Sequence, residues 1–392
     1  MTSPYEPDEL ITALVAHEPG AARRREAVRV VRSPGRVNLI GEHTDYNDGL
    51  VLPAAIDREI RLAYFSTDDG RVELTRLDDG QRGGFALDDS YRASGTWIDY
   101  AAGTAAALAE AGLPTRGLRG VVASDLPENA GLSSSAAIEL AVAWALLGDA
   151  ADGVDRLTLA QICQRAENAF VGVQCGLMDQ FSVSCALAGV ALLLDCRSLQ
   201  WRPVALPDGV TLVVCHTGSQ RRLGTSEYNL RRAQCEEAVA GLARLDPSIK
   251  SLRDVTPELL ARGAPTLDPV VARRAAHIVA ENKRVRTVVA AFESGDLAAV
   301  GEAFHAGHLS LRNLFEISSP ELDALVEIAE KVPGVVAARM TGGGFGGCTV
   351  NLVRPDAIDA FASAVLEQYP ARTGLDPMVI PVAAAPGVGR IV

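Results

Sequence analysis

The sequence predicts an α+β protein made of two domains. At 392 residues, the chain is long enough to form two separate hydrophobic cores. Apolar residues make up 48% of it and charged residues 22%, which is the composition of a globular protein and not of a disordered one. Strand-like and helical segments alternate without a strict strand–helix–strand period, which favours α+β in both halves. We place the domain boundary near residue 200, so that the domains cover residues 1–200 and 201–392.

The first half of the chain alternates short apolar runs with helical stretches. The apolar runs are typical of strands and cover Val28–Val31, Gly49–Ile56, Ile60–Phe65 and Leu118–Ser124. The segment Thr96–Gly112 is rich in alanine and ends at a glycine, so we expect a helix there.

The second half is richer in helical segments. Two β-like runs, Ala191–Leu194 and Val210–Cys215, lie on either side of a turn-like LPDG sequence. The region from Glu227 to about Phe292 is predicted to be mostly helical. After it we expect a helix, a strand and a helix, at Leu322–Lys331, Thr349–Val353 and Ala357–Gln368.

Composition and charge exclude several classes of function. The net charge of −12 argues against a nucleic-acid partner, because phosphate backbones require clustered positive charge. The acidic N-terminus lacks the order of a signal peptide, and no apolar run approaches the ~20 residues that span a bilayer. The seven cysteines are scattered without CxxC spacing, so we expect reduced thiols in the cytoplasm and no structural metal site. His305 and His308 have no carboxylate or cysteine pattern nearby in the sequence, and we expect both at the surface.

The most informative segment is Gly35–Gly49, with the sequence GRVNLIGEHTDYNDG. It is too polar for a core strand and too rich in glycine and asparagine for a helix. Its polar groups are those that recognise several hydroxyls at once, and they are Arg36, Asn38, Glu42, His43, Asp45, Tyr46, Asn47 and Asp48. A solvated surface loop is the alternative interpretation, since loops are normally polar. The strand-like segments on both sides favour a site held between two rigid elements.

A second segment, Leu126–Ala137 (LPENAGLSSSAA), joins a turn-rich loop to an apolar helix. The first N–H groups of a helix have no intrahelical partners and its dipole favours negative charge, so such a loop can hold a phosphate. The alternative is an ordinary serine-capped helix. No GxxxxGK[ST] motif is present, and none of the three lysines lies in this loop. A nucleotide here would meet backbone N–H groups, Mg²⁺ and arginine instead of a P-loop lysine.

A third segment, Arg165–Phe181, carries Glu167 and Asp179 in otherwise apolar surroundings. Two carboxylates near a phosphate suit a metal ligand and a base. A helix-surface glutamate and a capping aspartate are the alternative interpretation.

A fourth segment, Met340–Val350 (MTGGGFGGCTV), formally matches the GxGxxG fingerprint of dinucleotide-binding proteins. A β-like segment follows the glycines where that fingerprint requires a helix, so we reject this assignment. The glycines instead allow the backbone to approach another group closely. A purely structural β-turn is the alternative.

The Gly35–Gly49 segment resembles the signature of galactokinases, members of the superfamily that also holds homoserine, mevalonate and phosphomevalonate kinases (GHMP kinases). The resemblance runs from about Val28 to Val353. It implies a two-domain GHMP-kinase-like fold of mixed sheets and helices with the active site between the domains. Residues 1–200 would form a galactose- and ATP-binding domain and residues 201–392 a C-terminal GHMP-kinase domain. Where galactokinases usually carry Gly-Ala-Gly, this chain has Asn129-Ala130-Gly131, and we expect a working loop because asparagine tolerates left-handed backbone.

The resemblance also implies the activity, which is ATP-dependent phosphorylation of α-D-galactose at the C1 hydroxyl with Mg²⁺ as cofactor. Asp179 falls on the catalytic aspartate, and Arg36 would neutralise charge at the phosphoryl group or hold Asp179 ionised. The sugar-binding residues would be Glu42, His43, Asp45 and Tyr228. The ATP-binding residues would be Gly131, Leu132, Ser133, Ser134, Ser135, Ala136, Trp97 and Tyr100. Glu167 would hold Mg²⁺ together with Ser134 or Ser135, and the glycine-rich loop would pack near the nucleotide loop.

Two alternative functions remain open. The first is a kinase of the same superfamily acting on galactosamine or N-acetylgalactosamine, because the sequence does not show how much room exists at C2. The second is a non-catalytic sensor of galactose and ATP on the same fold, which the presence of both Glu167 and Asp179 disfavours. We expect galactose and ATP as partners of a monomer, with no nucleic-acid, membrane or obligate protein partner.

Overall fold

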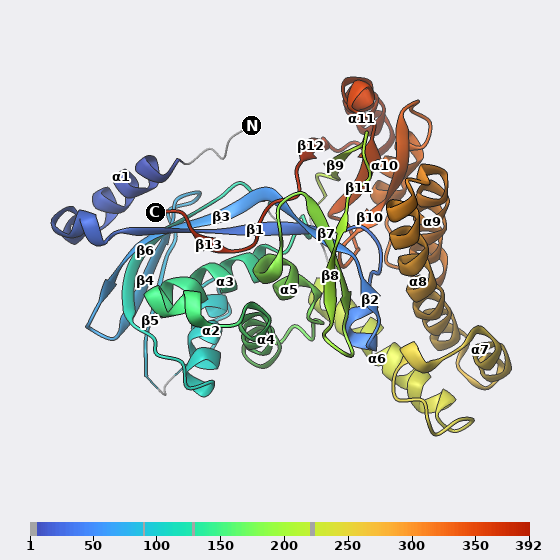
Figure 1. Cartoon of the computed structure of the whole chain (residues 1–392), viewed down its shortest axis with the longest axis horizontal. Helices are drawn as coiled ribbons and strands as arrows, with labels where there is room; N and C mark the ends of the chain where they lie inside the picture. The colour runs from blue at the N-terminus through green and yellow to red at the C-terminus, as the bar shows by residue number, and fades with distance from the viewer. Residues whose placement is uncertain (1–5, 89–90, 128–129, 220–223) are drawn as a thin grey trace.

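The computed structural model describes residues 6–88, 91–127, 130–219 and 224–392. Two parts, each built around a sheet, lie end to end along the long axis of the molecule (Figure 1). The N-terminal half of the chain supplies most of the first part. The C-terminal half supplies most of the second, with its long helices at the far end.

The first part contains a six-stranded sheet in the order β13-β1-β3-β6-β4-β5. Its neighbouring strands are antiparallel, except that β4 and β6 are parallel. The strands are β1 (Arg29–Asn38), β3 (Pro53–Thr67), β4 (Arg71–Arg76), β5 (Arg82–Ala86), β6 (Gly117–Ser124) and β13 (Gly389–Arg390). Successive side chains of a strand point to opposite faces of the sheet. Neighbouring apolar residues therefore place apolar side chains on both faces of this sheet, and helices bury each face.

Helices cover both faces of this sheet. Helix α1 (Pro7–His17) packs on one face, where Leu10 and Leu14 contact a cluster that includes Val30 and Ala63. The other face is covered mainly by α2 (Asp99–Glu110), α3 (Ser134–Leu147), α4 (Arg156–Ala166) and α5 (Met178–Cys185). Every residue of α3 from Ala136 to Leu147 is buried, so α3 is the central helix of this core.

One stretch differs from the expectation about apolar runs. Among the described residues, Ser134–Gly153 is long and apolar enough to cross a membrane by length and composition alone. Within the protein, 72% of its most apolar window is buried. The stretch comprises α3 and the short η3 (Gly148–Gly153).

The second part contains a four-stranded antiparallel sheet in the order β10-β11-β9-β12. Its strands are β9 (Thr211–His216), β10 (Val335–Thr341), β11 (Cys348–Val353) and β12 (Met378–Val382). Helices α10 (Pro320–Ala329) and α11 (Ile358–Thr373) bury one face around Phe361 and Tyr369. Helices α8 (Pro269–Ser294) and α9 (Leu297–Ser310) bury the other face through residues such as Phe292 and Phe304.

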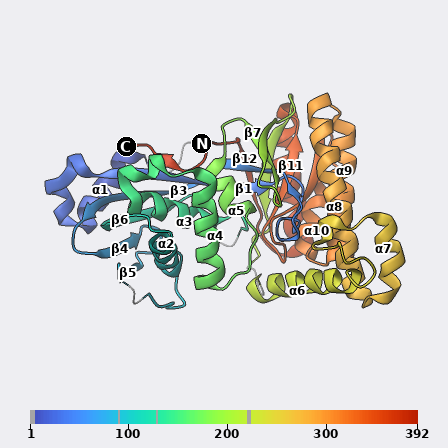
Figure 2. The same ribbon diagram turned by 60° about the horizontal axis from the view of Figure 1, so that its bottom comes forward.

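Smaller elements connect the two parts. A three-stranded sheet joins β2 (Leu50–Val51), β7 (Val190–Asp195) and β8 (Trp201–Ala205) in the order β2-β7-β8. Helices α6 (Gly224–Leu242) and α7 (Pro257–Gly263) lie along the lower side of the second part (Figure 2). Two π-turns, η4 (Glu167–Val171) and η7 (Leu311–Phe315), extend α4 and α9.

Most of the elements expected from the sequence are present, with two corrections. Strand β1 continues to Asn38, so Gly35–Asn38 belongs to a buried strand, although the whole Gly35–Gly49 segment was expected to be too polar for one. His308 is 3% exposed and lies 3.1 Å from Asp323, so it is not a surface residue. The sequence missed this carboxylate because it comes from α10, the next helix.

The domain boundary near residue 200 stays a prediction. The last residues of the chain return to the first part, where β13 pairs with β1.

Candidate active site

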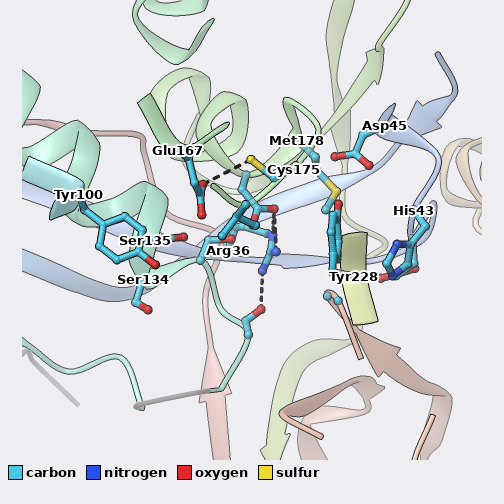
Figure 3. Close-up of a pocket in the computed structure, with 17 residues that line it drawn as sticks. Arg36, His43, Asp45, Tyr100, Ser134, Ser135, Glu167, Cys175, Met178 and Tyr228 are labelled. Carbon is cyan, nitrogen blue, oxygen red and sulfur yellow. Dashed lines mark hydrogen bonds and ion pairs between the residues drawn. The ribbon is translucent and has the colours of Figure 1, made fainter. Parts of the chain in front are cut away.

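A cavity of about 390 Å³ opens where the two parts meet. Seventeen residues from six separate segments line it, and Figure 3 draws them. Tyr100, Ser134 and Ser135 lie at one end of the cavity, His43 and Tyr228 lie at the other, and Arg36 lies between them. The cavity therefore has two chemically different ends joined by an arginine.

The end formed by the Gly35–Gly49 segment is mostly buried, so the interpretation as a solvated loop is wrong. Glu42 is 1% exposed and His43 4% exposed, and His43 has a positive φ of 62°. The His43 ring lies 5.0 Å from the Tyr228 ring and 4.8 Å from the Phe315 ring, centroid to centroid. Its Nδ1 is 2.8 Å from the hydroxyl of Tyr46. Neighbouring aromatic rings thus hold His43 against the cavity.

Burial changes the acid–base properties of the two carboxylates at this end. Desolvation raises the pKa of Glu42 to about 7, although the nearby Arg339 lowers it. Desolvation, together with the negative charge of Asp179, raises the pKa of Asp45 to about 6, although backbone N–H groups of Tyr46 and Met178 lower it. Both carboxylates can accept hydrogen bonds from hydroxyl groups when ionised.

Arg36 and Asp179 form the centre of the cavity. The Nη2 atom of Arg36 is 2.7 Å from Oδ1 of Asp179, and Nε donates to the same oxygen at 2.9 Å. A third donor, Nη1, binds the carbonyl oxygen of Gly131 at 2.7 Å. Asp179 is the second residue of α5, where the positive end of the helix dipole stabilises a carboxylate. The side chain of Arg36, from the Gly35–Gly49 segment, therefore contacts both the serine loop and the Arg165–Phe181 segment.

The serine loop lies at the start of α3, with an unusual backbone. Ser133, the N-cap residue, has a left-handed conformation (φ 63°, ψ 42°), and its side chain makes no capping bond to the described residues of α3. Such a conformation is costly for a residue other than glycine, and residues of this kind cluster at active sites and ligand-binding loops. The first N–H groups of α3 are therefore not occupied by the serine side chain, so the alternative of an ordinary serine-capped helix is wrong here.

Not every predicted nucleotide-loop residue reaches the cavity. Gly131, Ser133, Ser134 and Ser135 line it. Leu132 and Ala136 are 2% and 0% exposed and belong to the hydrophobic core behind the loop. Asn129, the departure from the usual glycine, lies outside the described residues.

Glu167 projects toward the cavity from the π-turn η4 and is almost fully buried. Its Oε2 accepts hydrogen bonds from Gln180 Nε2 at 2.6 Å and from the Cys175 thiol at 3.4 Å. Desolvation and the charge of Asp179 raise the pKa of Glu167 to about 7, whereas hydrogen bonds from Cys175, Gln180 and Ser135 lower it. The Ser135 hydroxyl and the Glu167 carboxylate are thus neighbours.

A second cavity of about 310 Å³ adjoins the first and shares Tyr100, Ser134 and Ser135 with it. Its walls are largely apolar and include Trp97, Val122 and Ile138. A planar aromatic ligand fits such walls, and the shared serines would hold its polar extension. Trp97 lines this second cavity and not the first.

Several lining residues were not identified from the sequence. Cys175 and Met178 belong to the Arg165–Phe181 segment, and their proximity to Glu167 and Asp179 was the signal that could have found them. Gly342 and Gly343 line the cavity that the serine loop also lines, so the glycine-rich segment reaches the site. The apolar walls of the second cavity come from ordinary strand and helix positions that carry no sequence signal.

Comparisons with known proteins agree with this geometry. Residues 21–64 match the galactose-binding signature of galactokinases. Residues 99–189 match the N-terminal domain of GHMP kinases, and residues 288–371 match their C-terminal region. A galactokinase from a Roseiflexus species is 42% identical over 367 residues, which cover 92% of this chain and 93% of the relative. A galactokinase from Chloroflexus aurantiacus is 44% identical over 362 residues, which cover 90% and 91% of the two chains.

Solved structures give the same result for the fold. Lactococcus lactis galactokinase complexed with galactose has a TM-score of 0.90 and 34% identity, covering 96% of this chain and 99% of that one. The mevalonate kinase of Methanococcus jannaschii has a TM-score of 0.67 at 16% identity, covering 92% and 99%, and shares the fold. The expected two-domain GHMP-kinase fold is confirmed.

Proposed function

The chain belongs to the galactokinase family and phosphorylates galactose with ATP, and we propose that it does so at the C1 hydroxyl of α-D-galactose in the cavity between its two parts. The observation that carries this assignment is the order of groups along the cavity. Hydrogen-bonding carboxylates and aromatic rings lie at one end, a helix N-terminus lies at the other, and the Arg36–Asp179 pair lies between them.

Glu42, His43, Asp45 and Tyr228 form the sugar site in this proposal. Burial raises the pKa of the Tyr228 hydroxyl well above its ordinary value, so that it remains a neutral hydrogen-bond donor. The carboxylates of Glu42 and Asp45 would accept hydrogen bonds from sugar hydroxyls. A sugar with one hydroxyl in the wrong place would leave one of these buried groups unpaired, which costs ~1–3 kcal/mol.

Asp179 would act on the C1 hydroxyl. Its carboxylate accepts two bonds from Arg36 at one oxygen, which leaves the other oxygen to accept the proton of the attacking hydroxyl. Arg36 would hold the Asp179 carboxylate in place and offset negative charge near the transferred phosphoryl group. Phosphoryl transfer depends mainly on alignment and charge stabilisation, so the held position of Asp179 matters as much as its basicity.

The nucleotide would extend from the serine loop into the second cavity. The triphosphate would meet the first N–H groups of α3, where the dipole favours negative charge. The base would lie against Trp97 and Tyr100. Leu132 and Ala136 would support the loop from the core and not contact ATP.

The residues present suit Mg²⁺. Within the described residues, no group of three or more His, Cys, Asp and Glu side chains is gathered for a metal ion. A single carboxylate, a hydroxyl and phosphate oxygens are nevertheless the set that Mg²⁺ uses with a nucleotide, because it keeps several water ligands. Glu167 and Ser135 would supply the protein ligands, since both line the cavity and the nearby Ser135 hydroxyl lowers the pKa of Glu167. The bound ion would offset the charge of the phosphate oxygens.

We also propose a cytoplasmic monomer. All seven cysteines lie within the described residues, and none forms a disulfide there, which suits a reducing compartment. No feature of the described residues favours the sensor alternative.

A coupled ADP-release assay with MgATP tests the proposed substrate. It would compare galactose, glucose, galactosamine, N-acetylgalactosamine and mevalonate at equal concentration. We expect turnover with galactose and none with glucose or mevalonate. Turnover with the two C2-substituted sugars above that with galactose would assign the neighbouring substrate instead. Galactose binding without turnover on any sugar would support a sensor.

A further inference from the structure

Arg339, on β10, is fully buried beneath the sugar end of the cavity. Its Nη2 donates to Oε2 of Glu42 and, at 3.0 Å, to Oε1 of Glu281. Its Nη1 donates to the carbonyl oxygen of Leu39 at 3.4 Å, and its guanidinium lies over the ring of Phe304. Arg339 therefore contacts the Gly35–Gly49 segment at two points without lining the cavity itself.

Glu281, on α8, holds Arg339 from the other side and is also fully buried. Its Oε1 accepts a hydrogen bond from the N–H of Gly41 at 3.0 Å, and its Oε2 accepts one from Arg284 at 2.5 Å. Burial disfavours the charged form, but the adjacent Arg339 and Arg284 hold the pKa of Glu281 well below its ordinary value. Two carboxylates and two guanidinium groups thus balance each other around Gly41.

The two oxygens of Glu42 have different roles in this arrangement. Oε2 is occupied by Arg339, whereas Oε1 is buried and has no hydrogen-bond partner among the described residues. Glu42 lines the cavity. A buried acceptor without a partner is costly, and a ligand hydroxyl at this position would satisfy it.

We propose that Arg339, held by Glu281, is a positioning residue for sugar recognition, which fixes the Glu42 carboxylate so that Oε1 receives one particular hydroxyl of galactose. The inference rests on the proposed sugar-binding role of Glu42. A guanidinium group suits this task because its planar set of donors fixes the direction of each partner, whereas an ammonium group acts as a point charge. Specificity for one hydroxyl requires such a fixed acceptor.

The position of Arg339 also joins the sugar site to the glycine-rich segment. Thr341, two residues further on, donates from Oγ1 to the carbonyl oxygen of Asn38 and accepts from its N–H, both at 2.9 Å. Gly342 and Gly343 follow directly and line the cavity. The end of β10 thus holds the end of β1, from which Glu42 follows.

The test is a set of galactose analogues, each lacking one hydroxyl, measured as kcat and KM on the full-length enzyme and on its variants. In the wild type, one analogue should lose the bond to Glu42 and show a KM about tenfold or more above that of galactose. We call the ratio of an analogue's KM to the KM of galactose the penalty for that analogue. Glu42→Gln identifies the analogue that lacks the hydroxyl bound by Glu42, because the penalty for that analogue should shrink in this variant.

In Arg339→Lys we expect the KM for galactose to rise by about tenfold. The penalty for the same analogue should shrink as in Glu42→Gln, whereas penalties for the other analogues and the KM for ATP should stay unchanged. Arg119→Lys, which alters a paired arginine at the far end of the first sheet, serves as the control and should leave all penalties unchanged.

A merely structural Arg339 would lower the melting temperature and reduce turnover of every analogue in the same proportion, which would overturn the inference. If Arg339→Lys does not fold, Glu281→Gln decides the question by the same change in the penalty for that one analogue. An unchanged galactose KM in Glu42→Gln would instead remove Glu42 from the sugar site, so that the proposed function of this residue and the inference fail together. An effect of Glu42→Gln that neither second variant reproduces would overturn the inference alone.

Discussion

Arg36 and Asp179 are paired across 2.7 Å, although they are 143 residues apart in the sequence. Arg36 lies in strand β1 and Asp179 in the first turn of α5, and the same arginine also binds the serine loop at Gly131. The sheet, the helix and the loop are thereby held in one arrangement. A change in any of the three would move the carboxylate that is proposed to act on the sugar.

Asp179→Asn tests the proposed base. The amide is nearly the same size but does not accept a proton, so we expect kcat to fall by about 10²- to 10⁴-fold while galactose binding is largely retained. Calorimetry with galactose and the ADP-release assay measure the two quantities on the same preparation. Substantial remaining kcat would remove Asp179 from the chemistry.

Gly176→Ala tests the position of Asp45. A Cβ atom at residue 176 would lie 2.0 Å from Oδ2 of Asp45, so this carboxylate must move in the variant. We expect kcat/KM for galactose to fall by about 10- to 100-fold, because small displacements in an active site have large effects. Gly153→Ala is the matched control, since nothing lies within 4 Å of its Cβ position. Equal kcat/KM values for galactose in the two variants would mean that the position of the Asp45 carboxylate does not matter for activity.

The pH dependence of galactose binding follows from the carboxylates at the sugar end. Burial raises the pKa of Glu42 to about 7 and that of Asp45 to about 6, so both gain protons as the pH falls through this range. The ionised forms accept hydrogen bonds from hydroxyl groups, so galactose affinity should decrease from pH 8 toward about pH 6. Binding at about pH 6 should also release protons, which calorimetry in buffers of different ionisation enthalpy detects. Binding that releases no protons at this pH would contradict the prediction.

Ser135→Ala and Ser134→Ala distinguish the two possible hydroxyl ligands of the metal ion. Because the Ser135 hydroxyl lies near enough to Glu167 to lower its pKa, loss of this hydroxyl should weaken Mn²⁺ binding in the presence of a non-hydrolysable ATP analogue by about tenfold. Ser134→Ala should have a smaller effect. Electron paramagnetic resonance of free Mn²⁺ measures the Mn²⁺ affinity of each variant and requires no turnover. The reverse order of effects would assign Ser134 as the ligand.

Much of the candidate site could be predicted because its residues lie in continuous segments. Glu42, His43 and Asp45 belong to one run of the sequence, and Glu167 and Asp179 belong to another. In both runs the polar residues stand out because the neighbouring sequence is apolar. Trp97 and Leu132 show the limit of this reasoning. Trp97 lines the neighbouring cavity, and Leu132 faces the hydrophobic core. A sequence motif does not indicate which residues of a loop point toward the ligand.

The chain by itself determined the α+β class, most of the strands and helices, and the segments that carry the chemistry, because these depend on local composition and on the alternation of apolar residues. Only the tertiary structure decided how the segments meet. Arg339 lies 297 residues from Glu42 in the sequence and has no unusual neighbours there, yet it is bonded to the Glu42 carboxylate. His308 has its carboxylate partner on another helix. Buried charges require partners, and those partners come from whichever elements the packing of the two parts brings to them.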